Sequence, residues 1–472
     1  MEKKNYYFLG IGGIGMSALA RYFLHEGCRV AGYDRTESPL TRQLVAEGAE
    51  IHYEESVEAI PAAMRNAATT IVVYTPAVPT EHAEYQYFLQ HGFTIEKRSQ
   101  MLGHLSEGHY VMAVAGTHGK TTTSTLTAWL NLALTEGGSA FLGGISKNFE
   151  SNLYLGERGN RLAVEADEFD RSFLRLQPDV AVITSADADH LDIYGTHEAV
   201  KEAFSQFVDR IKVGGALVLK QGVDVAVNNR DITLYRYAYD TPSDFYATHI
   251  RLEEGGHYRF DLVMPDRTVQ DCTLGIPGWV NIENAVAAVA MCWVAARREG
   301  VAFDEERLRW GLAHFQGVKR RFEFYVNTPT QVYMDDYAHH PRELSAALTS
   351  VRGMFPGRRI MAIFQPHLYT RTRDLYREFA EALSQADEVV LLPIYPAREE
   401  PIEGVCSEMI AAEVTIPCRI VEREALAEWL REVPTDVVIT FGAGNIDACC
   451  GAVAEVLSGK VLGSEPHDMK SE

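Results

Sequence analysis

The stretch VMAVAGTHGKTTT, residues 111–123, joins an apolar run to a glycine-rich loop and then to the start of a helical segment. Its first residues predict a buried strand, so the loop lies between a strand and a helix. In such a loop, backbone N–H groups surround phosphate oxygens, the lysine reaches the β- and γ-phosphates, and the following threonine hydroxyl binds Mg²⁺. The sequence therefore predicts an ATP site formed by Gly116, Thr117, His118, Gly119, Lys120, Thr121 and Thr122.

The loop matches a short form of the phosphate-binding motif. The longer form reads Gly-x-x-x-x-Gly-Lys-Ser/Thr, and Val114 stands where its first glycine would be. The strand–loop–helix setting nevertheless favours a phosphate site over a glycine turn that happens to carry a lysine.

Polar groups follow two later apolar runs. Residues 162–164 lead to Glu165, and residues 180–184 lead to Asp189 and His190. Because the carboxyl ends of parallel strands share one edge of a sheet, both groups are expected to face the phosphate loop. Mg²⁺ prefers oxygen ligands. The expected Mg²⁺ ligands, with Mn²⁺ as an expected substitute for the ion, are Thr121, Glu165 and His190.

A second glycine turn lies near the N-terminus. An apolar run at residues 6–9 leads into Gly10-x-Gly12-x-x-Gly15, and Asp34 ends the next apolar run. Glycines in this pattern allow backbone N–H groups to approach a diphosphate, and an acidic residue at this spacing binds a ribose hydroxyl. The pattern also suits NAD, and a tight turn without a ligand is the other interpretation. The candidate residues are Gly10, Ile11, Gly12, Gly13, Ile14, Gly15 and Asp34.

The composition is that of a globular protein with an acidic surface. The chain has 472 residues and a formal net charge of −21. This balance argues against non-specific nucleic-acid binding, which relies on Lys and Arg to neutralise phosphates. The seven cysteines form no Cys-x-x-Cys pair, which indicates neither a zinc site nor a disulfide framework and fits a reducing cytoplasm.

The N-terminus has some features of a signal peptide. Lys3 and Lys4 precede an apolar run, but glycines between residues 10 and 15 interrupt it, and a strand-like segment follows at residues 28–33. A folded N-terminus is therefore expected. No apolar run reaches the ~18–20 residues needed to cross a bilayer, so a cytoplasmic protein without membrane insertion is predicted.

Short apolar runs alternate with amphipathic helical segments through most of the chain, which is typical of parallel α/β sheets. The pattern restarts at residues 6–9, at residues 110–115 and near residues 331–334. Residues 224–274 instead alternate polar and apolar side chains, which predicts antiparallel strands. The expected fold is α/β, with an added antiparallel sheet in the second of three domains, at residues 1–107, 108–320 and 321–472.

Taken together, these motifs resemble those of the Mur amino-acid ligases of peptidoglycan synthesis. The resemblance runs through nearly the whole chain. The matching segments are GIGGIGM (10–16), AGTHGKTTT (115–123), EADE (165–168), DH (189–190), NIEN (281–284), RRFE (320–323), DDYAHHP (335–341) and QPHLYTRTR (365–373).

The resemblance implies the layout and the site of that family. The first domain is then a Rossmann-like domain that binds a UDP-sugar, the second a P-loop ATPase-like domain, and the third a Rossmann-like domain that closes on ATP and the amino acid. The implied residues are Asn281, Asn284, Arg321 and Asp336 for ATP, Tyr337, His339, Arg371 and Arg373 for the amino acid, and Lys120, His190, Arg321, His339 and His340 for catalysis.

The resemblance also implies a reaction. A protein of this kind would use ATP to join L-alanine to the carboxylate of UDP-N-acetylmuramic acid through an acyl phosphate, giving ADP and phosphate. Lys120 and Arg321 would stabilise charge on the reacting oxygens. Either His339 or His340 would assist deprotonation of the amine. The partners would be small molecules alone, and the protein would be a monomer or a weak homodimer.

Two further interpretations remain open from the sequence. A peptidoglycan-recycling ligase would join a tripeptide to the same UDP-sugar, although residues 365–373 favour L-alanine. A nicotinamide-dependent dehydrogenase, from another class of enzyme, would use the N-terminal glycine turn for its cofactor. One departure from the resembled family is Val280, where relatives carry histidine beside the adenine.

Overall fold

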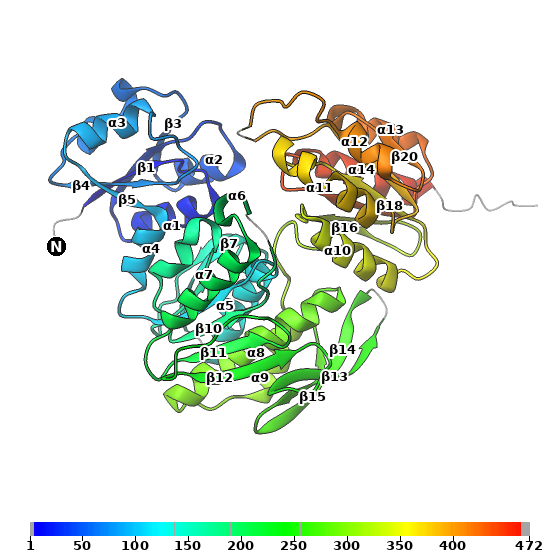
Figure 1. Ribbon diagram of the computed structural model, residues 1–472, viewed down its shortest axis with the longest axis horizontal. Coiled ribbons are helices and arrows are strands. Elements are labelled where there is room, and N and C mark those ends of the chain that lie inside the picture. The colour runs from blue at the N-terminus through cyan, green and yellow to red at the C-terminus, as the bar shows by residue number, and fades with distance from the viewer. Residues whose placement is uncertain (1–3, 136, 189–190, 254–255, 398, 464–472) are drawn as a thin grey trace, which may run out of the picture. The chain divides into compact units, whose positions relative to one another are not determined.

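The computed structural model describes residues 4–135, 137–188, 191–253, 256–397 and 399–463 (Figure 1). The chain divides into two compact units. Unit 1 comprises residues 1–248, 261–272 and 283–316, and unit 2 comprises residues 249–260, 273–282 and 317–472. The first predicted domain and most of the second fall together in unit 1, and the boundary between them stays a prediction.

The N-terminal part of unit 1 is a five-stranded parallel sheet in the order β3-β2-β1-β4-β5. The strand at residues 6–9 is confirmed as β1. Because β1 lies between β2 and β4, the chain crosses to opposite sides of β1, and ligands bind in the crevice at such a point. The strands are β1 (Asn5–Leu9), β2 (Arg29–Tyr33), β3 (Glu50–His52), β4 (Thr70–Tyr74) and β5 (Thr94–Lys97), and the helices are α1 (Ile14–His25), α2 (Pro39–Ala46), α3 (Ala83–Gln90) and α4 (Arg98–Ser106).

A ten-stranded sheet follows, in the order β15-β14-β13-β12-β11-β10-β6-β9-β7-β8. The strand predicted at residues 110–115 is β6, and it lies between β9 and β10. The strands are β6 (Tyr110–Ala115), β7 (Ser139–Ser146), β8 (Ser151–Tyr154), β9 (Arg161–Glu165), β10 (Val180–Ile183), β11 (Ala216–Lys220), β12 (Thr233–Ala238), β13 (Phe245–Leu252), β14 (Tyr258–Met264) and β15 (Arg267–Thr273). The accompanying helices are α5 (Lys120–Thr135), η3 (Phe169–Arg175), α6 (Leu191–Tyr194), α7 (His197–Asp209), α8 (Trp279–Glu299) and α9 (Glu305–Ala313).

The polar–apolar alternation predicted before residue 274 is clearest in β14. Its side chains alternate between buried and half-buried positions, beginning with buried Tyr258 and ending with buried Met264. Strands β13 to β15 extend the ten-stranded sheet at one edge. The predicted antiparallel pairing is wrong for β12, which lies in the same segment but pairs parallel with β11 and with β13.

A six-stranded sheet in the order β16-β17-β21-β18-β19-β20 forms the C-terminal part of unit 2. The strand predicted near residues 331–334 is β17, but β16 precedes it and pairs with it antiparallel. The strands are β16 (Glu323–Asn327), β17 (Val332–Asp336), β18 (Ile360–Phe364), β19 (Glu388–Leu391), β20 (Cys418–Ile420) and β21 (Val437–Phe441), and the helices are α10 (Pro341–Met354), α11 (Tyr369–Leu383), α12 (Ser407–Glu413), α13 (Leu426–Glu432) and α14 (Asp447–Gly463).

One core joins the first two sheets within unit 1. Phe8 and Phe23 from the first sheet and its helix belong to the same buried cluster as Phe141 and Phe173. Helix α1 packs on β7 and β8, and α4 packs on η3. The two sheets of unit 1 therefore hold their strand ends in fixed relation to each other.

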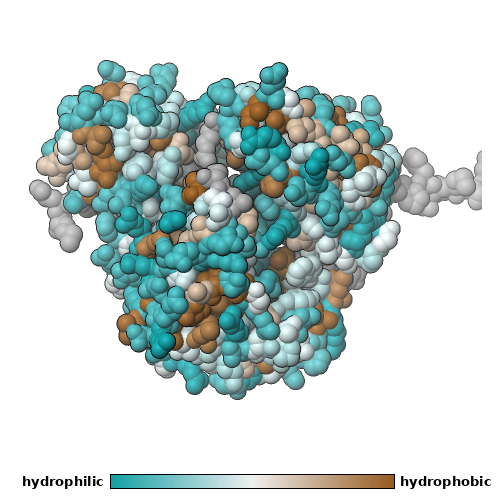
Figure 2. Space-filling model, viewed as in Figure 1, coloured by the Kyte–Doolittle hydropathy of each residue, from teal (hydrophilic) through white to brown (hydrophobic). Residues whose placement is uncertain are grey.

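The surface and the longest helix bear on membrane contact. The face seen in Figure 2 is largely hydrophilic, with apolar side chains in separate patches. Helix α8 has the length and hydropathy of a membrane span, although the sequence predicted no apolar run of that length. Of its apolar window, 83% is buried inside the fold. A buried core helix passes the same test.

Two glycines offer opposite stability changes. A Cβ at Gly353, in α10, would meet nothing within 4 Å, whereas a Cβ at Gly32 would lie 2.5 Å from the Phe8 carbonyl oxygen on the neighbouring strand. We predict that Gly353→Ala raises the free energy of unfolding by about 0.5–1 kcal/mol, because alanine is the better helix former. Gly32→Ala should lower it by about 1–3 kcal/mol through overpacking. Denaturant unfolding measures both, and a stabilised Gly32→Ala protein would contradict the β1–β2 packing.

Candidate active site

The phosphate loop lies at the carboxyl end of β6, between the ends of β9 and β10. The order β10-β6-β9 places the residues after Glu165 and those after Ile183 on either side of the loop, as predicted for the two polar strand ends. The loop is tied to the end of β10 by hydrogen bonds. Thr117 Oγ1 donates to Ser185 Oγ at 2.9 Å, and the His118 N–H donates to the same oxygen at 2.8 Å.

Two glycines of the loop are required by its shape. Gly116 has φ +137°, and a Cβ there would lie 2.0 Å from Thr184 Oγ1. Gly119 has φ +79°, and a Cβ there would lie 2.8 Å from Asn284 Oδ1. Asn284 also accepts a hydrogen bond from Thr123 Oγ1 at 3.2 Å, so this predicted ATP-binding residue lies against the loop. The loop thus keeps a close backbone approach that side chains would block.

Lys120, at the start of α5, forms a buried ion pair with Glu168. Its Nζ donates to the two Glu168 carboxylate oxygens at 2.9 and 2.7 Å and to the Gly116 carbonyl oxygen at 2.7 Å. Burial alone lowers the pKa of Lys120, but Glu168, Asp167 and Glu165 outweigh it, so the pKa lies above its ordinary value. Lys120 is therefore a permanent cation held beside the loop.

Glu168 was absent from the predicted site, although it lies in the quoted EADE segment. Its side chain is 1% exposed, and burial raises its pKa while Lys120 opposes that rise. The signal that points to its role is its spacing, three residues beyond the end of β9. A carboxylate so placed holds the lysine at the loop through charge-assisted hydrogen bonds.

Glu165 and Thr121 fit a Mg²⁺ site by the chemistry of their oxygens. The Glu165 carboxylate lies against Gly143 of β7, where a Cβ would be 2.1 Å from Oε2, so the glycine leaves room beside that carboxylate. Thr121 is buried in the first turn of α5. The third predicted ligand, His190, lies outside the described residues. Across the residues that the structure does describe, no group of three His, Cys, Asp or Glu side chains forms a ready metal cluster.

The remaining loop residues are engaged within the fold. The Asp187 N–H donates to Thr117 Oγ1 at 3.1 Å, and the Asp187 carboxylate lies 3.3 Å from His118 Nε2. Thr122 is buried in α5. These contacts fix the loop's shape and leave the phosphate-binding role of each residue a proposal.

The N-terminal glycine turn follows β1 and opens α1, as predicted. Gly10 has φ +84°, with a would-be Cβ 2.6 Å from Thr75 Cγ2, and Gly13 caps α1. Asp34 lies at this turn, where its Oδ2 accepts the Gly12 N–H at 2.7 Å, and its contact with a ribose stays a prediction. The carboxylate thus stabilises the turn itself.

The side chains of this turn point different ways. Ile11 is fully buried, whereas Ile14 is 36% exposed at the start of α1. A Cβ at Gly15 would lie 2.9 Å from Nη1 of Arg98, a residue that the sequence did not single out. A cation therefore lies beside the predicted diphosphate turn.

In unit 2, two adjacent aspartates at the end of β17 hold the RRFE segment. Arg320 Nε donates to Asp335 Oδ2 at 2.9 Å, and the Arg320 and Arg321 guanidinium carbons lie 5.1 Å from the Tyr337 ring centroid. Asp336 accepts the Phe322 N–H at 2.9 Å and the Ala338 N–H at 2.8 Å. Burial raises the pKa of Asp336 to about 6, although Arg321 and the two N–H groups oppose this.

Each Asp336 oxygen accepts one backbone N–H, so the carboxylate fixes the chain on either side of Tyr337 and places this ring under Arg321. The predicted contact of Asp336 with ATP stays a prediction.

The paired histidines have different surroundings. His340 caps α10, with its Nδ1 accepting the Arg342 N–H at 3.3 Å. His339 lies 3.5 Å from Glu343 and 6.4 Å, ring to ring, from His367. Burial lowers the pKa of His339 to about 4, with Glu343 opposing and Arg371 adding to the effect. His339 is therefore neutral near pH 7 and has a lone pair available as a weak base.

Arg371 and Arg373, predicted to bind the amino-acid carboxylate, have different surroundings. Both lie on α11, two residues apart, and such residues do not face one another on a helix. Arg373 is exposed and donates to the neighbouring Asp374 at 2.7 Å, whereas Arg371 is close enough to His339 to influence its pKa. The amino-acid-binding role of both arginines stays a prediction.

Asn281, the other predicted adenine-side residue, donates through Nδ2 to the Pro277 carbonyl oxygen at 2.6 Å. Val280 is partly buried and packs against the apolar core of unit 2. A side chain in that core makes a poor contact for a polar base edge.

Known protein families match most of the chain in three consecutive segments. Residues 5–110 match the model described as "Mur ligase family, catalytic domain", residues 114–292 match "Mur ligase middle domain", and residues 320–444 match "Mur ligase, glutamate ligase domain". The chain is 49% identical over 453 residues to a UDP-N-acetylmuramate–L-alanine ligase of Parabacteroides distasonis, covering 96% of each chain.

The chain belongs to the Mur ligase family.

Solved structures agree with this assignment. The UDP-N-acetylmuramate-alanine ligase of Thermotoga maritima superposes with a TM-score of 0.79 and 26% identity, covering 98% of this Mur ligase and 100% of that chain. A murein peptide ligase of Psychrobacter arcticus has a TM-score of 0.69 and 22% identity, covering 96% and 98%, which establishes a shared fold. The predicted family and the three-domain α/β fold are confirmed.

The buried ion pair between Lys120 and Glu168 predicts that loss of the carboxylate destabilises the fold. Glu168→Ala would leave the Lys120 ammonium, 13% exposed, without its carboxylate. We predict a loss of about 3–5 kcal/mol in the free energy of unfolding, and a smaller loss in the double variant Lys120→Met/Glu168→Ala, which buries no unpaired charge. Calorimetric unfolding of the two variants tests this. A Glu168→Ala protein as stable as the wild type would contradict the pairing.

The lowered pKa of His339 predicts a pH dependence of stability. Its pKa is lowered from 6.5 to about 4 in the fold, so the unfolded chain binds more protons between these values. Stability should therefore fall as the pH drops from 6.5 towards 4, by about 3 kcal/mol in all. The raised pKa of Asp336 changes the stability in the opposite direction over the same pH range. The test is therefore the difference in the free energy of unfolding between wild type and His339→Gln, measured at each pH. If that difference is constant from pH 7 to pH 4, His339 is not buried in its neutral form.

Proposed function

We propose that this Mur ligase uses ATP to join L-alanine to the carboxylate of UDP-N-acetylmuramic acid, releasing ADP and phosphate. The observation that carries the proposal is the buried Lys120–Glu168 pair at a glycine loop, with Glu165 on the adjoining strand end. The names of the similar proteins in Parabacteroides distasonis and Thermotoga maritima support the choice of substrates.

The first step activates the sugar acid. A carboxylate oxygen attacks the γ-phosphorus of ATP, the bond from this phosphorus to the β–γ bridging oxygen breaks, and ADP leaves with that electron pair. Lys120 would leave Glu168 for the γ-phosphate, because the loop holds its ammonium within reach of both groups. Thr121 and Glu165, with His190 as the further expected ligand, would hold Mg²⁺, which supplies positive charge to the phosphoryl oxygens when bound.

The second step forms the amide. The neutral amine of L-alanine attacks the acyl carbon, the bond from this carbon to the phosphate oxygen breaks, and phosphate leaves with the former carboxylate oxygen. The amine proton must go to a base. His339 fits this role, since it is neutral near pH 7, and Arg371 beside it would bind the amino-acid carboxylate.

The turn at Gly10–Gly15 would hold the UDP diphosphate through its backbone N–H groups and the N-terminus of α1. On this proposal the protein is a cytoplasmic enzyme of cell-wall synthesis whose partners are small molecules. A recycling ligase for a tripeptide is the second candidate, because the murein peptide ligase of Psychrobacter arcticus shares the fold.

An ADP-release assay tests the proposal. With ATP, Mg²⁺ and UDP-N-acetylmuramic acid, we expect release with L-alanine and little with the tripeptide L-alanyl-γ-D-glutamyl-meso-diaminopimelate. Removal of Mg²⁺ by a chelator should stop the reaction. Lys120→Met should lower kcat by about 10²–10³-fold, because it removes a charge that stabilises the transferring phosphoryl group.

The matched control is Lys201→Met. Lys201 lies on α7 and pairs with Asp224, which is exposed, so this variant should keep full activity. ADP release with the tripeptide but not with L-alanine would support the recycling ligase instead. No release with either amine would overturn the proposal.

A further inference from the structure

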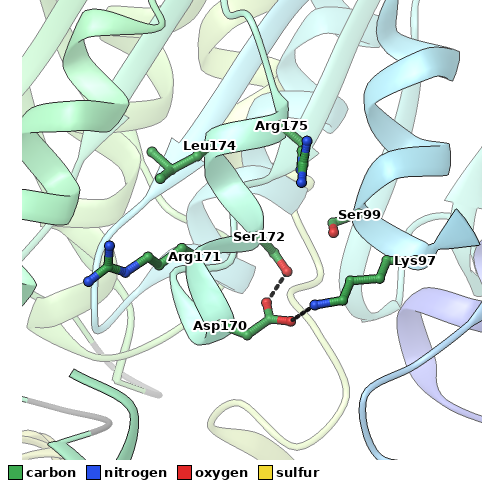
Figure 3. Close-up of a pocket in the computed structure, with 7 residues that line it drawn as sticks. All are labelled: Lys97, Ser99, Asp170, Arg171, Ser172, Leu174 and Arg175. Carbon is green, nitrogen blue, oxygen red and sulfur yellow. Dashed lines mark hydrogen bonds and ion pairs between the residues drawn. The ribbon is translucent and has the colours of Figure 1, made fainter. Parts of the chain in front are cut away.

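A cavity in unit 1 lies outside every residue so far given a function. It has a volume of about 320 Å³, and its lining comes from the start of α4 and from η3 (Figure 3). In this view Lys97, Ser99, Ser172 and Arg175 surround the cavity, with Asp170 at its edge. We call it the Lys97–Arg175 pocket.

The pocket lies where the two sheets of unit 1 present their carboxyl ends. Lys97 is the last residue of β5, and η3 follows the end of β9 after the EADE segment. These are the edges at which parallel sheets bind ligands. The predicted diphosphate turn follows β1 in one sheet, and the phosphate loop follows β6 in the other. The pocket therefore belongs to the ligand-binding edge of both sheets.

The turn that forms one wall is locally strained. Asp170 has φ +49° and Arg171 has φ +60°, both in the left-handed region that residues with a Cβ seldom adopt. The Ser172 hydroxyl donates to the Asp170 carboxylate, which lies 3.7 Å from Lys97 Nζ. Strain of this kind persists where the surrounding structure requires a particular arrangement of side chains.

The charge of the pocket is positive. Lys97 and Arg175 face one carboxylate, Asp170, and within the described parts of the chain no hydrogen bond or ion pair engages the Arg175 guanidinium. The Ser99 hydroxyl adds a further donor. In a protein with a net charge of −21, a local excess of cations attracts anions.

A smaller cavity continues from this pocket to the candidate metal ligand. It shares Ser99 and Ser172 with the pocket, and its other lining residues include Arg98, Glu165 and Asp167. Arg98 lies 3.7 Å from Asp167 and beside Gly15 of the diphosphate turn. A row of cationic side chains thus connects the turn, the Lys97–Arg175 pocket and Glu165.

We propose that the Lys97–Arg175 pocket is an anion subsite for the acid substrate, in which Arg175 and Lys97 donate hydrogen bonds to phosphate or carboxylate oxygens of the UDP-sugar acid. This inference rests on the proposed function and names two specificity-determining residues for it. The volume suits one anionic group with part of the sugar, and guanidinium and ammonium groups bind both kinds of oxygen.

The test is calorimetric binding of UDP-N-acetylmuramic acid to the full chain without ATP. Arg175→Gln and Lys97→Gln should each weaken binding about tenfold, the loss expected when one hydrogen bond to a charged group is removed. The matched control is Lys201→Gln. Lys201 lies on α7, is not among the residues that line the pocket, and pairs with the exposed Asp224, so its substitution removes one positive charge without changing the lining. This variant should bind within twofold of the wild type.

A second ligand identifies the group that the pocket holds. UDP-N-acetylglucosamine carries the same diphosphate but lacks the lactyl carboxylate. Equal weakening of both ligands by Arg175→Gln assigns the pocket to the diphosphate, and weakening of the acid alone assigns it to the carboxylate. Inorganic phosphate, titrated separately, should bind far more weakly than either.

The inference fails if Arg175→Gln and Lys97→Gln, folded by circular dichroism, bind UDP-N-acetylmuramic acid as the wild type does. It also fails if Lys201→Gln weakens binding as strongly as they do, because the effect would then be one of overall charge. ADP release by the wild type with L-alanine reports on the proposed function independently, so the two failures are distinguishable.

Discussion

The buried ion pair between Lys120 and Glu168 is the interaction on which the rest of the site depends. Burial disfavours the charge of this lysine, and Glu168, together with Asp167 and Glu165, keeps it charged beside the loop. The pair needs β9 next to β6, because Glu168 follows one strand and Lys120 the other. The same strand order brings Glu165 and Ser185 to the loop. The parallel sheet thus brings three separate sequence segments to one edge, the proposed phosphate site.

The parts of the fold that sequence predicted well are those with strong local patterns. The apolar runs before Gly10 and Gly116 are β1 and β6, and the two polar strand ends flank the phosphate loop. Family membership followed from motifs spread over the whole chain. The strand β16 was not predicted, although Phe324, Tyr325 and Val326 are strand-forming residues. Helix α8 contains no unbroken apolar run, because polar residues interrupt it.

Side-chain roles were less predictable, because they depend on which neighbour lies closest in space. Asp34 has the spacing of a ribose ligand, yet it binds the glycine turn itself. Asp336 is occupied by two backbone N–H groups, and Arg373 by Asp374. Neither Arg98 nor Arg175 belongs to a recognised sequence motif. Arg98 lies beside Gly15 and Arg175 lines a cavity only because α4 and η3 pack together in the fold.

The central claim is that the loop and its neighbours transfer the γ-phosphoryl group of ATP to a sugar carboxylate. The most direct test uses UDP-N-acetylmuramic acid labelled with the heavy oxygen isotope in its carboxylate, with mass analysis of the phosphate released during ligation of L-alanine. An acyl phosphate passes one carboxylate oxygen to phosphate, so the account predicts one labelled oxygen in each phosphate formed. Phosphate that contains no label would contradict it.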